Sequence, residues 1–89
     1  MNQFSAKLWR WPSPNGILML TLPVEAEFPV MGPFGRTPVT ATALGKTWRT
    51  STWHTREHGT ILLMPKKVIR KRGEGEVVEV ELELDMLPR

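Results

Sequence analysis

Two histidines and a glutamate lie close together in the segment His54-Thr55-Arg56-Glu57-His58. The spacing matches the H-x-x-E-H pattern of the inverted zinc peptidases, in which two imidazoles hold the metal and the glutamate acts as general base. That chemistry needs a helix, because a four-residue spacing puts both imidazoles on one face only in a helix. Here a glycine follows the segment and β-type residues flank it, which favours a hairpin loop. We therefore predict no metal site and no peptidase activity.

No other combination of residues indicates a catalytic site. Glu79, Glu81 and Glu83 recur at every second position and could form a carboxylate site, but like charges on an exposed strand are more often a solubility device. Both histidines lie in the predicted loop, so a Ser-His-Asp triad would be hard to assemble. The chain has no cysteine, which excludes thiolate zinc sites and cysteine nucleophiles. The sequence predicts a protein that is not an enzyme and has no cofactor.

Tryptophan and arginine are the residues best suited to hold a ligand. The predicted binding set joins an aromatic wall to arginine and hydroxyl groups, and consists of Arg36, Trp48, Arg49, Ser51 and Trp53. Such a set could hold a planar or anionic molecule. Strand alternation puts Arg49 and Trp53 on one face and Trp48 on the other. The alternative is that tryptophan fills a small core without tyrosine, with arginine stacked over a ring. Our leading hypothesis is binding of a small ligand or a protein partner.

A cluster of positive charge gives the alternative hypothesis. It consists of Lys66, Lys67, Arg70, Lys71 and Arg72. Proline at the start and Gly73 at the end predict a helix over residues 65–72. On that helix Lys67 and Lys71 would share one face, as would Lys66 and Arg70. Phosphate contacts from this stripe would suit a DNA-binding or antitoxin-like dimeric regulator. No aromatic residues are interleaved for base stacking, so nucleic acid is possible but not favoured.

Short strands must position these residues. Eight prolines and seven glycines leave no room for a long helix. Apolar runs and two-residue alternation predict strands over 4–9, 17–22, 39–43, 47–53, 60–64 and 78–85. The last strand alternates most clearly, with valine and leucine toward the core and Glu79, Glu81, Glu83 and Asp85 toward water or a basic partner. The chain is therefore expected to be mostly β, with about six short strands and one or two short helices in a small barrel or sandwich.

Length and charge limit the remaining possibilities. With 89 residues the chain is expected to form a single domain over 1–89. The net charge of +3 divides unevenly, because residues 1–73 carry eleven Lys or Arg and three acids, whereas 74–89 carry six acids and one Arg. No apolar stretch is long enough to span a bilayer and the N-terminus does not resemble a signal peptide. We expect a cytoplasmic protein without membrane contact, either a monomer or a homodimer.

Several short motifs occur in a fixed order along the chain. They are Phe4-Ser5-Ala6-x-Leu8-Trp9, Thr21-Leu22-Pro23, Gly35-Arg36-x-Pro38-Val39, Gly45-x-Thr47-Trp48-Arg49-Thr50-Ser51, Leu62-Leu63-x-Pro65-x-Lys67 and Gly75-Glu76-x-Val78-Glu79-Val80. In this order they resemble a bacterial family, domain-of-unknown-function family number nineteen hundred and five. The resemblance implies a small β-barrel domain and no established reaction or ligand. Residues 64–80 are also similar to the second half of AbrB-type swapped-hairpin domains, which are dimeric DNA-binding regulators and antitoxins.

Overall fold

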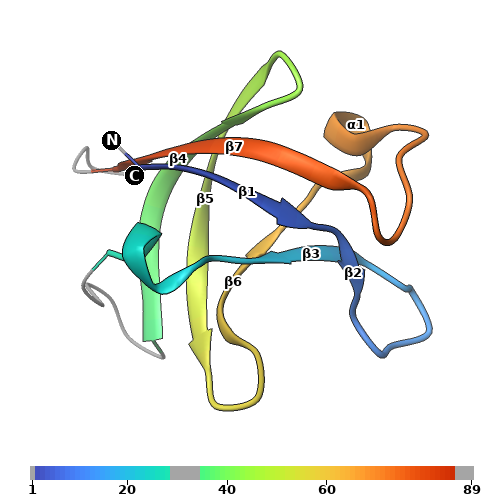
Figure 1. The fold of residues 1–89 in the computed structure, drawn as a ribbon, viewed down its shortest axis with the longest axis horizontal. Coiled ribbons are helices and arrows are strands. Elements are labelled where there is room, and N and C mark those ends of the chain that lie inside the picture. The colour runs from blue at the N-terminus through green and yellow to red at the C-terminus, as the bar shows by residue number, and fades with distance from the viewer. Residues whose placement is uncertain (1, 29–34, 86–89) are drawn as a thin grey trace.

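Seven antiparallel strands form one sheet in the part of the chain that the structure describes. The computed structural model describes residues 2–28 and 35–85. Within these ranges the strands are β1 (Asn2–Lys7), β2 (Trp9–Arg10), β3 (Leu18–Thr21), β4 (Arg36–Ala43), β5 (Lys46–Thr55), β6 (Gly59–Leu63) and β7 (Val77–Leu84). The sheet order is β1-β7-β4-β5-β6-β3-β2. Two short helices, η1 (Val24–Ala26) and α1 (Lys66–Ile69), lie at opposite ends of the molecule (Figure 1).

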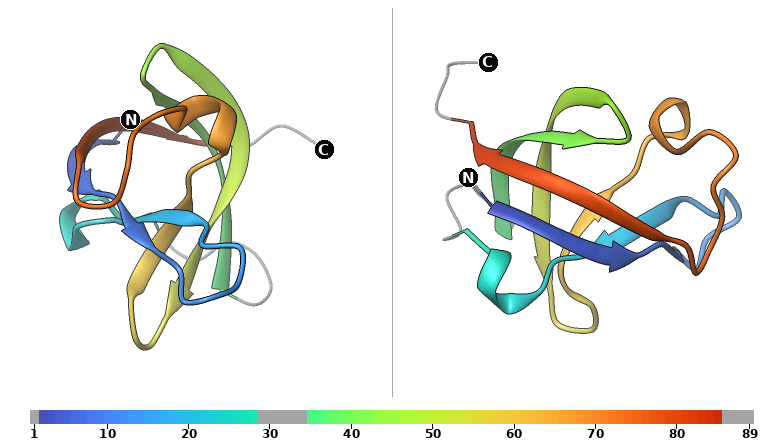
Figure 2. Two further views of the ribbon diagram at one scale, coloured as in Figure 1. Left: turned by 90° about the vertical axis from the view of Figure 1, so that its right-hand side faces the viewer. Right: turned by 45° about the horizontal axis from the view of Figure 1, so that its top comes forward.

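The sheet curls into a nearly closed barrel. β1 and β2 stand at the two ends of the strand order, yet only Leu8 separates them in the chain, so the two edges must approach each other. Figure 2 shows the strands wrapped around a common centre. Leu8 is 1% exposed, and its backbone bonds to the loop before β7: its N–H donates to the Glu76 carbonyl at 2.9 Å, and its own carbonyl accepts from Gly75 N–H at 2.7 Å. The predicted small, mostly-β barrel is confirmed, and the predicted strand over 4–9 divides at Leu8.

The core lies inside the barrel and follows the predicted alternation of β7. Val78, Val80 and Leu82 are each at most 1% exposed. Glu79 and Glu83 are exposed on the other face, as expected. Asp85 follows the end of β7 and is only 8% exposed, because its backbone N–H donates to the Pro38 carbonyl at 2.9 Å and its carboxylate pairs with a basic residue of β5.

The predicted helix over residues 65–72 is wrong in length, since α1 ends at Ile69. Arg70 has φ 50° and ψ −107°, a conformation that cannot continue a helix. The Arg72 N–H donates to the Ile69 carbonyl at 2.9 Å and closes a tight turn instead. The predicted basic stripe, with Lys67 above Lys71, therefore does not form. Val68 and Ile69 face the core as expected, at 4% and 5% exposure.

Neither short helix in residues 2–28 and 35–85 has the length and apolar composition needed to cross a membrane.

Candidate functional site

Two neighbouring strands, β3 and β6, bury apolar side chains on both of their faces. Leu20 and Leu62 point inward and belong to the core. Met19 and Ile61 stand on the outer face, outside the core cluster, yet they are only 5% and 3% exposed. An outward side chain of a one-layer barrel normally meets water. Something on the outside must therefore cover these two residues.

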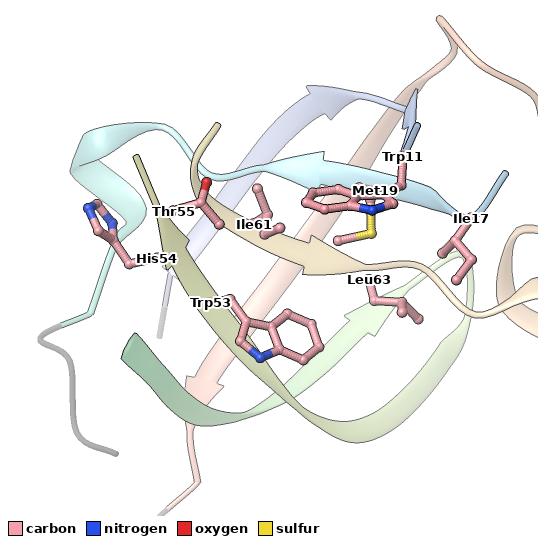
Figure 3. A pocket seen from close by; sticks show the side chains of 8 residues that line it. All are labelled: Trp11, Ile17, Met19, Trp53, His54, Thr55, Ile61 and Leu63. Carbon is pink, nitrogen blue, oxygen red and sulfur yellow. The ribbon is translucent and has the colours of Figure 1, made fainter. Parts of the chain in front are cut away.

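The cover is a set of aromatic side chains that surrounds a hollow. The hollow has a volume of about 380 Å³ and is lined by Trp11, Ile17, Met19, Trp53, His54, Thr55, Ile61 and Leu63. In Figure 3 the two indoles stand apart, with Met19, Ile61 and Leu63 between them, while the His54 ring lies at one end. We call this feature the outer hollow. Its lining is almost wholly apolar, and its floor is built from β3 and β6.

A short hairpin between β2 and β3 positions Trp11. The Trp11 N–H donates to the Ile17 carbonyl at 2.8 Å, and the Gly16 N–H donates to the Ser13 carbonyl at 3.0 Å. Gly16 has φ +58°, which suits a tight turn, and the residue types of Ser13-Pro14-Asn15-Gly16 are typical of one. Trp11 is thereby held across from Ile17, at the edge of the apolar floor.

A stacked aromatic cluster supports the same wall. Trp9 donates from its indole Nε1 to Thr21 Oγ1 at 2.9 Å, which fixes its ring over the outer face of β3. The His58 ring stacks on Trp9 with centroids 4.6 Å apart and meets Trp11 edge-on at 5.5 Å. The two indoles are 5.8 Å apart. Trp11 is therefore braced by neighbours on the side away from the hollow.

The predicted hairpin loop is confirmed for residues 56–58, which form a tight turn, whereas His54 and Thr55 belong to the end of β5. Thr55 Oγ1 accepts from His58 N–H at 3.0 Å and donates to the Gly59 carbonyl at 3.0 Å. His54 Nδ1 lies 3.0 Å from Thr60 Oγ1. The two imidazoles thus contact different partners, and they do not share a helix face as a zinc peptidase requires.

Trp53 forms the opposite wall. It pairs in register with Ile61 of β6 on one side and with Arg36 of β4 on the other. The Arg36 guanidinium lies 5.1 Å from the ring centroid, a cation–π distance. Within residues 2–28 and 35–85, no acidic side chain forms an ion pair with Arg36. The indole is braced by a cation on the β4 side and borders the hollow on the β6 side.

The structure divides the predicted binding set. Arg36 and Trp53 are stacked on each other at the outer hollow. Arg49 lies further along β5, where its Nε donates to Asp85 Oδ2 at 2.7 Å and ties β5 to the end of β7. Ser51 stands opposite Pro38 in the ladder. Trp48 packs against the barrel core, on the other face of the strand.

Sequence reasoning missed most of the lining, namely Trp11, Ile17, Met19, Ile61 and Leu63. A signal was present. The runs Ile17–Leu20 and Ile61–Leu63 are apolar at positions that should face out as well as in. Together with Trp9 and Trp11, which stand two positions apart, these runs indicate a second apolar layer outside the barrel.

The predicted nucleic-acid residues gather around α1. Lys66, Lys67, Arg70, Lys71 and Arg72 are all exposed there. Arg72 approaches Glu76 at 3.7 Å. None of them lines the outer hollow, but Lys66, Arg70 and Arg72 line an adjoining cavity that shares Ile17 and Leu63 with it.

One family comparison covers nearly the whole barrel. A family model described as "Domain of unknown function (DUF1905)" matches residues 4–82, from β1 into β7. This is the family whose motifs the sequence resembles, so the predicted resemblance is confirmed. No curated protein matches the chain.

Proposed function

We propose that the chain, which belongs to the DUF1905 family of domains of unknown function, is a binding module rather than an enzyme. Its ligand is a small, planar, largely apolar molecule that enters the outer hollow between Trp11 and Trp53. The family assigns no reaction, so the proposal rests on the geometry of this site.

The observation that carries the proposal is the apolar floor between two braced indoles. Met19 and Ile61 are nearly removed from water although they lie on the outside of the barrel. A ligand in the hollow would cover the half-buried side chains of Trp11, Trp53 and Leu63, and would gain about 25 cal/mol for each Å² of apolar surface covered. Indole faces favour offset or edge contacts with flat aromatic groups. The site therefore suits a planar ligand better than a flexible chain.

The size of the hollow favours a small molecule over a protein partner. Its volume of about 380 Å³ lies at the lower end of the range for small-molecule sites, roughly 300–1,000 Å³. A stable protein interface typically needs about 800 Å² from each partner. The surface around the hollow also carries charged and polar groups, including Arg36 and His54.

The regulator hypothesis loses its main support. It depended on a basic stripe along a two-turn helix, and α1 has four residues. Binding of a small ligand therefore remains the leading proposal.

The proposal is tested by titrating the ¹⁵N-labelled chain with 2-naphthol, a planar and uncharged probe, and following the indole N–H resonances. We expect the Trp11 and Trp53 signals to move together and saturate, while the Trp48 signal stays in place. Trp53→Ala should weaken binding at least tenfold. Trp48→Phe is the matched control, since it removes an indole from the core side and should leave affinity within about twofold. Equal losses in both variants, or a saturating shift only at Trp48, would contradict the proposal.

A further inference from the structure

A second hollow lies between the β4–β5 hairpin and α1, at the other end of the barrel from the β5–β6 turn (Figure 1). It has a volume of about 310 Å³ and is lined by Lys46, Thr47, Trp48, Lys67, Val68 and Arg70. Two chain segments far apart in sequence thus bring three cationic side chains to one concavity, and none of the described residues that line it is acidic. We call it the basic hollow.

These cations are not neutralised by neighbouring residues. Within residues 2–28 and 35–85, none of Lys46, Lys67 and Arg70 forms an ion pair. Glu76 lines a neighbouring cavity together with Arg70, but the two carboxylates of the loop before β7 contact other groups. Glu74 lies 3.7 Å from Arg10, and Glu76 lies 3.7 Å from Arg72 and accepts a hydrogen bond from the Gly73 N–H. Three like charges on one concavity repel one another, so an anion bound among them would be favoured.

The backbone at Arg70 gives an independent indication. With φ 50° and ψ −107°, this residue takes the first central position of a turn of type II′, closed by the bond from Arg72 N–H to the Ile69 carbonyl. Glycine dominates that position because a side chain there is strained. Strain that persists in a folded chain often marks a functional residue. Here the strained turn carries a guanidinium into the wall of the basic hollow.

We propose that the basic hollow binds the phosphate group of a small phosphorylated molecule. The planar guanidinium of Arg70 can donate two parallel hydrogen bonds to phosphate oxygens, and Lys46 and Lys67 add point charges from two sides. The exposed edge of Trp48 supplies an apolar wall for the part of the ligand next to the phosphate. This site shares no lining residue with the outer hollow, so it stands or falls separately from the function proposed above.

A compact ligand fits better than a polynucleotide. On the other side of the β4–β5 hairpin, Glu79 and Glu81 line the surface next to Leu44. A nucleic-acid backbone that continued past the basic hollow in that direction would meet these carboxylates. A single phosphate or pyrophosphate group would not.

The test exploits the strain at Arg70. Arg70→Gly removes the guanidinium and supplies the residue that the turn prefers. We therefore expect it to melt at a higher temperature than the parent chain and to bind pyrophosphate at least tenfold more weakly by calorimetric titration. Arg56→Gly is the matched control, because it removes the same charge from the β5–β6 turn at the other end of the barrel. Its pyrophosphate affinity should stay within about twofold of the parent.

Further variants and ligands distinguish a small phosphorylated molecule from a nucleic acid. Lys67→Ala, which leaves the turn untouched, should also weaken pyrophosphate binding, by at least threefold. Equal weakening by Arg70→Gly and Arg56→Gly would overturn the proposal, because binding would then reflect net charge alone. So would absence of pyrophosphate binding to the parent chain at millimolar concentration. Arg70-dependent binding of a 12-nucleotide DNA strand more tightly than pyrophosphate would overturn it in favour of a nucleic-acid surface.

Discussion

Leu82→Ala tests the register of the barrel directly. Leu82 is fully buried in β7, where it stands opposite Asn2 of β1 and Ala41 of β4. The substitution removes three carbon atoms, worth about 0.8 kcal/mol each in transfer free energy, or about 2.4 kcal/mol in all. Because the small side chain of Ala41 cannot fill the space, a cavity term adds to this. We expect a loss of about 3–4 kcal/mol in the free energy of unfolding.

The matched control is the adjacent residue on the opposite face. Glu81 accepts a hydrogen bond from Gln3 Nε2 at 3.0 Å in an exposed position, so Glu81→Gln should cost less than about 1 kcal/mol. In a domain of this size each kcal/mol lowers the melting temperature by about 4–8 °C. Thermal denaturation followed by circular dichroism should therefore separate the two variants by about 10–25 °C. Equal melting temperatures would refute the assigned register, because a slip of one residue exchanges the two faces.

Three further outcomes follow from single contacts. Asp85→Asn should destabilise the chain by about 1–2 kcal/mol in urea unfolding, because it weakens the charge-assisted hydrogen bond from Arg49. The loss stays this small because the Arg49 side chain is 46% exposed and water screens the pair. An unchanged urea midpoint would contradict this prediction. Gly59→Ala should cost about 1–2 kcal/mol from the backbone alone, because Gly59 has φ +69° and the nearest atom to an added Cβ is 3.9 Å away; a stabilised variant in the same assay would be the contrary result. Calorimetric titration with zinc should show no one-to-one site of sub-micromolar affinity, because His54 and His58 contact different partners. A zinc site of that affinity, lost in His58→Ala, would disprove this prediction.

Local patterns predicted the fold well because each strand carries its own signal. The alternation of β7 predicted which of its side chains face the core, and the Ser13–Gly16 turn was readable from its residue types. The break at Leu8 was not readable, because β1 and β2 form one continuous apolar-patterned segment. It arises only when the barrel closes and gives the two halves different neighbours.

The helix at α1 shows why propensity fails over short distances. Pro65 and Gly73 enclose seven residues, and all of them tolerate a helix. Burial of Val68 and Ile69 satisfies the apolar part of the segment within one turn. Nothing in the local sequence shows that Arg70 leaves the helical region, since this depends on the path of the chain to β7.

The site was predicted in part. Arg36 and Trp53 were selected because arginine and tryptophan suit ligands, and they do meet at one wall of the outer hollow. Arg49 was selected for the same reason, but its carboxylate partner lies 36 residues away, beyond the reach of spacing arguments. The floor residues went unnoticed because apolar side chains in strands are assigned to an inner core by default.

Binding at the outer hollow can be observed through intermolecular nuclear Overhauser effects. With 2-naphthol bound to the ¹³C-labelled chain, we predict contacts from the naphthalene protons to the methyl groups of Met19, Ile61 and Leu63. Contacts instead to Leu20, Leu62 or Val80 would place the ligand inside the barrel and refute binding at the outer hollow. Saturating binding that gives no contact to Met19, Ile61 or Leu63 would refute it equally.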